Sequence, residues 1–148
     1  MKTLLSWKFI ALIVILFLFF VRCGSDDNPT EPNYDTALTA NWKISKLSWE
    51  GLNDKGSYDQ SQLDSNGTVW SLTLKADKTA EQTTNYCCAL ADYTGTWSAT
   101  TYELTLKLSA QGSVNIIESV YQFVIQGSKL VLNWSETGTI YYAEFTKQ

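Results

Sequence analysis

Cysteine is the residue type in this chain whose placement suggests specific chemistry. The 148 residues include three cysteines and no histidine. Cys23 directly follows a long apolar run, whereas Cys87 and Cys88 are adjacent in the middle of the chain. A zinc site on the adjacent pair is not expected, because neither the Cys-x-x-Cys spacing nor a histidine ligand is present. The sequence therefore predicts no metal site and no cofactor.

The adjacent cysteines leave two alternatives open. Neighbouring residues on a strand point to opposite faces, so a disulfide between Cys87 and Cys88 would need a distorted turn. Such a strained bond would suit a redox switch or a rigid surface platform in an oxidising compartment. The other alternative is one buried and one exposed thiol. We favour the second alternative, because disulfide geometry is demanding.

The segment before Cys23 predicts export. Thirteen residues from Phe9 to Val21 carry no polar side chain. A helix of that length rises about 20 Å, which is short of the roughly 30 Å hydrocarbon core of a bilayer. The run therefore fits the apolar part of a signal peptide better than a membrane span.

The residues around Cys23 resemble the lipobox of bacterial lipoproteins, since the apolar run ends in Phe20-Val21-Arg22-Cys23-Gly24-Ser25. The resemblance implies cleavage after residue 22 and attachment of palmitate-type acyl chains to Cys23. Arg22 stands where that family has a small residue. The alternative is an uncleaved signal anchor in which Cys23 is an incidental thiol.

A polar tether is predicted after the signal peptide, over residues 23–36. This segment holds both prolines of the chain and few apolar side chains, so it cannot offset the entropy of ordering. Its composition resembles the tethers of Bacteroidota-type lipoproteins. The expected organisation is a signal peptide at residues 1–22, a lipidated tether at 23–36 and one domain at 37–148. The expected location is the bacterial cell envelope, at the outer membrane.

Charge excludes one class of partner. The mature chain from Cys23 onward keeps 8 of the 11 basic residues and all 15 acidic ones. Nucleic acid is not an expected partner, because phosphate binding needs a cluster of lysine and arginine that this chain lacks. No catalytic motif is present, so the sequence predicts a monomeric, non-enzymatic protein.

From residue 40 onward, apolar and polar residues alternate in one segment after another, which is typical of half-buried strands. A change of parity between Ile44 and Leu47 predicts a bulge near Lys46. The segment 115–126 is apolar on both faces, which predicts cover on both sides for part of its length. About eight strands with short turns and no helix predict an all-β fold, an antiparallel up-and-down (meander) barrel.

The first strand begins with Trp42, and a later strand carries Gly95-Thr96-Trp97, a pattern that resembles the lipocalin-like domains of bacterial lipoproteins. The similarity covers roughly residues 38–146. It implies that Trp42 closes the base of the barrel, which is a structural role.

Two functions fit such a barrel, because eight strands enclose either a solid core or one small ligand. The first is a lipocalin-like domain that binds a small hydrophobic or amphipathic molecule. The second is a solid-cored module that contacts a protein or glycan through its loops. The polar stretch from Glu50 to Thr68 favours the first, because such a long loop suits a lid over the barrel mouth. The candidate ligand-binding residues are Trp49, Tyr58, Trp70, Leu72, Leu106, Tyr121, Phe123 and Trp134.

Overall fold

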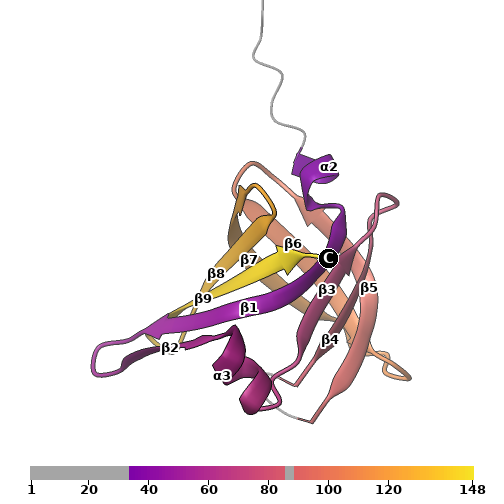
Figure 1. Cartoon of the computed structure of the whole chain (residues 1–148). Coiled ribbons are helices and arrows are strands. Elements are labelled where there is room, and N and C mark those ends of the chain that lie inside the picture. Colours follow the sequence, from indigo (N-terminus) through magenta and orange to yellow (C-terminus); the bar gives the residue numbers. More distant parts are fainter. Residues whose placement is uncertain (1–33, 86–88) are drawn as a thin grey trace, which may run out of the picture. The chain divides into compact units, whose positions relative to one another are not determined.

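The domain consists of nine strands and two short helices within residues 34–85 and 89–148, the part of the chain that this computed structural model describes (Figure 1). In chain order the elements are α2 (Tyr34–Leu38), β1 (Ala40–Glu50), β2 (Lys55–Asp59), α3 (Gln60–Ser65), β3 (Trp70–Leu74), β4 (Thr79–Thr84), β5 (Ala91–Ala99), β6 (Glu103–Ala110), β7 (Ile117–Gln126), β8 (Lys129–Glu136) and β9 (Thr139–Lys147).

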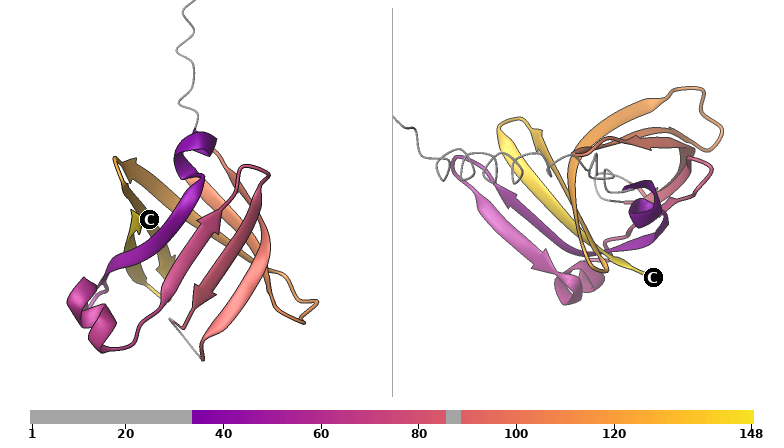
Figure 2. Two further views of the ribbon diagram at one scale, coloured as in Figure 1. Left: turned by 45° about the vertical axis from the view of Figure 1, so that its right-hand side comes forward. Right: turned by 90° about the horizontal axis from the view of Figure 1, so that it is seen from above.

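The strands form a closed antiparallel barrel. From β3 to β9 each strand pairs with the next one along the chain, and β1 pairs with both β3 and β9. Eight strands thus complete the ring, and β2 is an additional strand hydrogen-bonded to the second half of β1. Figure 2 shows the ring from above. The predicted all-β, eight-stranded meander barrel is confirmed.

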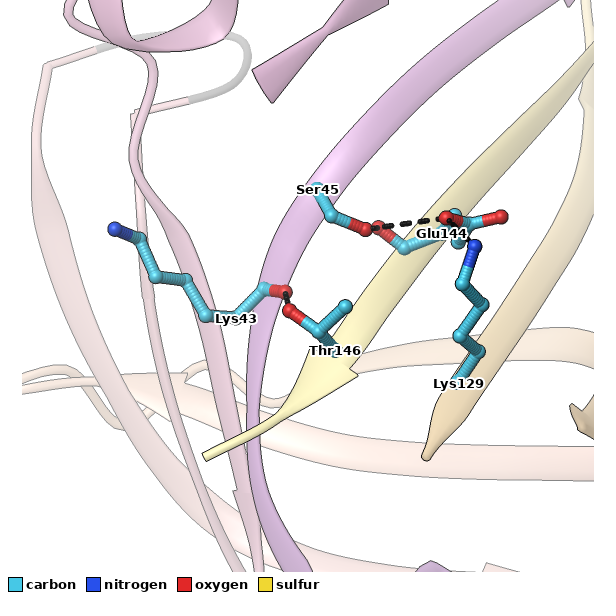
Figure 3. A network of polar contacts seen from close by, with 5 residues as sticks. All are labelled: Lys43, Ser45, Lys129, Glu144 and Thr146. Atoms are coloured by element: carbon cyan, nitrogen blue, oxygen red, sulfur yellow. Dashed lines mark hydrogen bonds and ion pairs between the residues drawn. The ribbon is translucent and has the colours of Figure 1, made fainter. Parts of the chain in front are cut away.

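The contact between β1 and β9 closes the ring and contains the predicted bulge. Their register shifts between Ile44 and Lys46, so Ser45 is the extra residue. The Ser45 hydroxyl donates a hydrogen bond to the backbone carbonyl of Glu144, 3.0 Å away. Lys129 of β8 lies 2.8 Å from the Glu144 carboxylate (Figure 3). One glutamate thus joins the bulge to the neighbouring strand on its other side.

The core fills one end and the middle of the barrel. At that end α2 lies against the strands: the Trp42 indole donates a 2.8 Å hydrogen bond to the carbonyl of Leu38, and the Tyr34 ring meets Phe123 edge to face at 5.6 Å. The predicted tether was therefore too long at its far end. Residues 34–36, expected to be disordered, are helical because Tyr34 packs against the core.

The Gly95-Thr96-Trp97 motif holds three strands together. A side chain at Gly95 would place its Cβ 1.9 Å from the carbonyl oxygen of Lys107, so only glycine allows β5 and β6 to approach here. Two residues later the Trp97 indole donates a 2.9 Å hydrogen bond to the Lys75 carbonyl at the end of β3. The Lys78 ammonium lies 3.9 Å from the centre of the same ring. Trp97 thus anchors the β3–β4 turn on β5.

The expected lid between Glu50 and Thr68 is wrong, because the segment folds into β2 and α3. Asp59 caps α3: its carboxylate accepts from the Gln62 backbone N–H, and the Gln62 side chain accepts from the Asp59 backbone N–H. This reciprocal pair stabilises the first turn of a short helix. Leu63 on that helix is 0% exposed and belongs to the core.

The helix α3 occupies a gap in the barrel wall. The β1–β3 pairing covers only Ala40–Lys43 against Ser71–Leu74, after which β1 continues alongside β2 instead. We call this divergence of β1 from β3 the filled seam, because α3 packs against β1 and β2 beside it (Figure 1) and contributes the buried Leu63 to the core.

The expectation that β7 is covered on both faces is also wrong. Phe123 points into the core, whereas Val120 and Val124 on the opposite face are 50% and 49% exposed. No described element packs over that outer face, so β7 has an interior and a solvent side like the other strands.

Candidate functional site

A cavity of about 850 Å³ opens at the end of the barrel opposite α2. Its wall combines the start of β3, the end of β4, the start of β7 and the end of β8, which the meander brings to the same end. The lining residues are Trp70, Gln82, Thr84, Tyr93, Glu103, Leu108, Ile117, Ser119, Val120, Tyr121, Gln122, Asn133, Trp134, Ser135, Glu136 and Ile140. The barrel is therefore solid at one end and hollow at the other.

Beside the cavity, β7 and β8 separate. Among the described residues, their pairing runs from the turn at Gln126 and Lys129 only as far as Gln122 and Asn133. The first five residues of β7, 117–121, pair with β6 alone, and residues 134–136 of β8 pair with β9. We call this divergence the open seam.

The cavity extends through the open seam. Successive residues of a strand point to opposite faces of the sheet. Tyr121 points inward and Val120 and Gln122 point outward, yet all three border the same cavity. A cavity confined to the barrel interior would not contact both faces of β7. A ligand in it therefore has two routes to solvent, the open end and the gap between β7 and β8.

Aromatic rings form the apolar wall of the cavity. The centroid of the Trp134 ring lies 5.7 Å from that of Trp70 and 5.6 Å from that of Tyr121, both in edge-to-face geometry. Trp134 also stacks on Tyr141 at 5.2 Å, and Trp70 meets Phe145 at 5.3 Å. Rings that contact one another in this way are held rigidly. The wall is therefore largely preformed.

Two of the polar lining residues, Tyr121 and Gln82, bring buried polar groups to the cavity. Burial raises the pKa of the Tyr121 hydroxyl above its ordinary value, while a hydrogen bond with the Ser119 side chain lowers it to a smaller extent. The side-chain carbonyl oxygen of Gln82 is buried, and no donor within residues 34–85 and 89–148 reaches it. A buried acceptor without a partner costs free energy, which a ligand donor would recover once a turn of the Gln82 side chain brings the oxygen to the cavity surface.

The candidate residues fall into three places. Trp70, Tyr121 and Trp134 line the cavity. Leu72, Leu106 and Phe123 lie on the same faces of their strands but in the solid core. Trp49 and Tyr58 pack against each other at 5.1 Å on the β1–β2 hairpin, where Trp49 borders a separate shallow depression. Sequence reasoning missed Gln82, Tyr93 and Ser119. Only Ser119 carried a signal, because it shares the face of Ile117, Tyr121 and Phe123 in the predicted strand 115–126.

All three cysteines, Cys23, Cys87 and Cys88, lie outside the described residues. Within the described ranges, no cluster of three or more metal-ligating side chains occurs. None of the helices in that part of the chain is long and apolar enough to cross a membrane.

Comparison with known proteins yields no relative: no family model, no curated protein and no solved structure matches this chain.

Proposed function

We propose that this domain binds a small apolar or amphipathic molecule in the cavity at its open end, as a lipocalin-like protein anchored in the bacterial cell envelope. The observation that carries the proposal is the cavity of about 850 Å³ lined by Trp70, Tyr121 and Trp134. Small-molecule sites typically occupy about 300–1,000 Å³ and combine an apolar, aromatic lining with a few polar groups. A solid-cored interaction module would have no need of such a space.

The test is uptake of pyrene, a hydrocarbon probe without charge or hydrogen-bonding groups, by residues 34–148. This segment contains the whole barrel and its core, so it is the unit that folds. The substitution Ser119→Trp places a large ring in the cavity, and we expect it to weaken pyrene binding by at least about tenfold. Ser119 is preferred to the core position Leu106, where a larger side chain would also disturb packing.

The matched control is Ser98→Trp, which adds the same ring to an exposed position on β5. We expect pyrene binding and the β-sheet circular dichroism of this variant to equal those of the parent. Unchanged uptake by a folded Ser119→Trp variant would refute the cavity as the binding site. Absence of uptake by the parent would favour the interaction module.

The proposed anchor has its own test. In a bacterial host, the full chain should incorporate an alkyne-tagged palmitate, and Cys23→Ser should abolish the labelling. Labelling that survives Cys23→Ser would refute lipid attachment at this residue.

A further inference from the structure

The charges around the cavity are of one sign. Glu103 and Glu136 are among its lining residues, and none of the described lining residues is a lysine or arginine. The ammonium group of Lys107 on β6 lies 3.4 Å from the carboxylate of Glu118 on the outer face. Lys129 is paired with Glu144 at the opposite end of β8. No cationic side chain of the described lining is therefore placed to meet an anionic ligand.

A carboxylate or phosphate head group would find no cation among the described lining residues. If the head lay inside, it would be a buried charge without an opposite charge to pair with, which is unfavourable. If it lay at the rim, it would face Glu136 at the end of β8, which repels it. Both placements disfavour an anionic amphiphile.

The buried carbonyl oxygen of Gln82 adds a positive requirement. On β4, Gln82 lies between Leu72 of β3 and Tyr93 of β5 in register. Within residues 34–85 and 89–148 its oxygen has no donor. The complementary group on a ligand is a hydroxyl or an amide N–H, both of which donate without carrying negative charge.

We propose that the natural ligand of the cavity is an amphiphile without negative charge, such as an alcohol or amide on an apolar body, which donates a hydrogen bond to Gln82 and is selected over the corresponding carboxylate. This inference rests on the proposed function and names the ligand class of the same site. Aliphatic alcohols, monoacylglycerols and primary amides of fatty acids belong to this class.

The test is displacement of pyrene by two probes with the same twelve-carbon chain, dodecanol and dodecanoate, at about pH 8, where the carboxylate is ionised. A low ionic strength, about 0.01 M, leaves the repulsion between the dodecanoate carboxylate and the glutamates of the cavity lining largely unscreened. We expect dodecanol to bind at least about tenfold more tightly than dodecanoate. Equal affinities, or tighter binding of dodecanoate, would overturn this inference while leaving the proposed function intact. Failure of pyrene itself to bind would instead overturn the proposed function.

Two variants sharpen the result. Gln82→Leu should weaken the binding of dodecanol severalfold relative to that of pyrene, because only the alcohol donates a hydrogen bond to Gln82. Unchanged dodecanol affinity would overturn the role of Gln82. Ile117→Lys adds a cation at the exposed start of β7, on the cavity rim. This variant should bind dodecanoate more tightly relative to dodecanol than the parent does. An unchanged ratio of the two affinities would overturn the electrostatic part of the inference.

Discussion

The barrel wall has two gaps, one of which is covered by another segment of the chain and one of which is not. At the filled seam, β1 leaves β3 after Lys43, and the intervening segment supplies both a strand and a helix that cover the gap. At the open seam, β7 and β8 separate beyond Gln122 and Asn133, and only a short turn connects them. The difference lies in chain length: the β1–β3 connection is long enough to fold back into the gap, whereas the β7–β8 connection is not.

The difference between the two seams explains the position of the cavity. A barrel of eight strands has an interior that its own side chains can fill or that can hold one small ligand. Where Leu63 enters the first gap, the interior stays solid. Where no side chain enters the second, a volume of about 850 Å³ remains. The candidate site is thus the part of the barrel that its connections leave uncovered.

The largest effect is expected from emptying the filled seam. Leu63→Ala removes a fully buried side chain, which typically costs about 2–5 kcal/mol in free energy of unfolding. Urea denaturation measures the loss, and Leu52→Ala, at a site 96% exposed on the β1–β2 hairpin, is the control. A loss below about 0.5 kcal/mol, as at ordinary surface sites, would mean that α3 does not contribute to closing the barrel.

A smaller effect is expected at the hairpin that supports α3. A Cβ at Gly56 would lie 2.3 Å from the Trp49 ring, which also donates a 3.0 Å hydrogen bond to Asp54. Gly56→Val should therefore displace the ring and cost about 1–3 kcal/mol. Hydrogen exchange should show faster exchange confined to β1, β2 and α3. Equal acceleration at β7 and β8 would show that the two seams are coupled rather than independent.

The smallest effect at neutral pH is expected at the open seam. Tyr121→Phe removes one hydroxyl and its hydrogen bond with Ser119, so the free energy of unfolding should change by about 1 kcal/mol or less. The difference should become visible at high pH. Burial raises the pKa of Tyr121, so above about pH 10 the unfolded chain loses this proton before the folded one does.

The stabilisation linked to this proton is therefore complete below about pH 10 and is lost as the pH rises through the pKa of the folded state. Parent and Tyr121→Phe should be compared by urea denaturation at about pH 8 and about pH 11, and the parent should lose more stability between them. An equal loss in both proteins would show that Tyr121 is solvated through the seam.

The sequence was most informative where the alternation was uninterrupted. From β3 to β9, period-two patterns separated by short turns predicted the meander, because burial on one face imposes that period directly. The segment that became β2 and α3 lacked such a pattern. Its one local signal was Asp59 followed three residues later by Gln62, the spacing of a capping box.

The cavity was harder to predict than the fold, because alternation tells which face a residue occupies and not how deep it lies. Leu72 and Trp70 share a face of β3, yet one lies in the solid core and the other lines the cavity. One signal of the open seam was available. The predicted strand at 115–126 was twice as long as the one at 129–134, and strands of unequal length joined by a short turn leave an overhang.

The overhang of β7 also affects how copies of the protein meet. Residues 117–121 pair with β6 on one side, so their other edge presents a row of backbone donors and acceptors that suits pairing with a strand of another molecule. Glu118 lies within that edge, and Glu136 lies at the end of β8 across the seam. When two identical edges approach, these carboxylates repel each other, as charges on exposed edge strands commonly do.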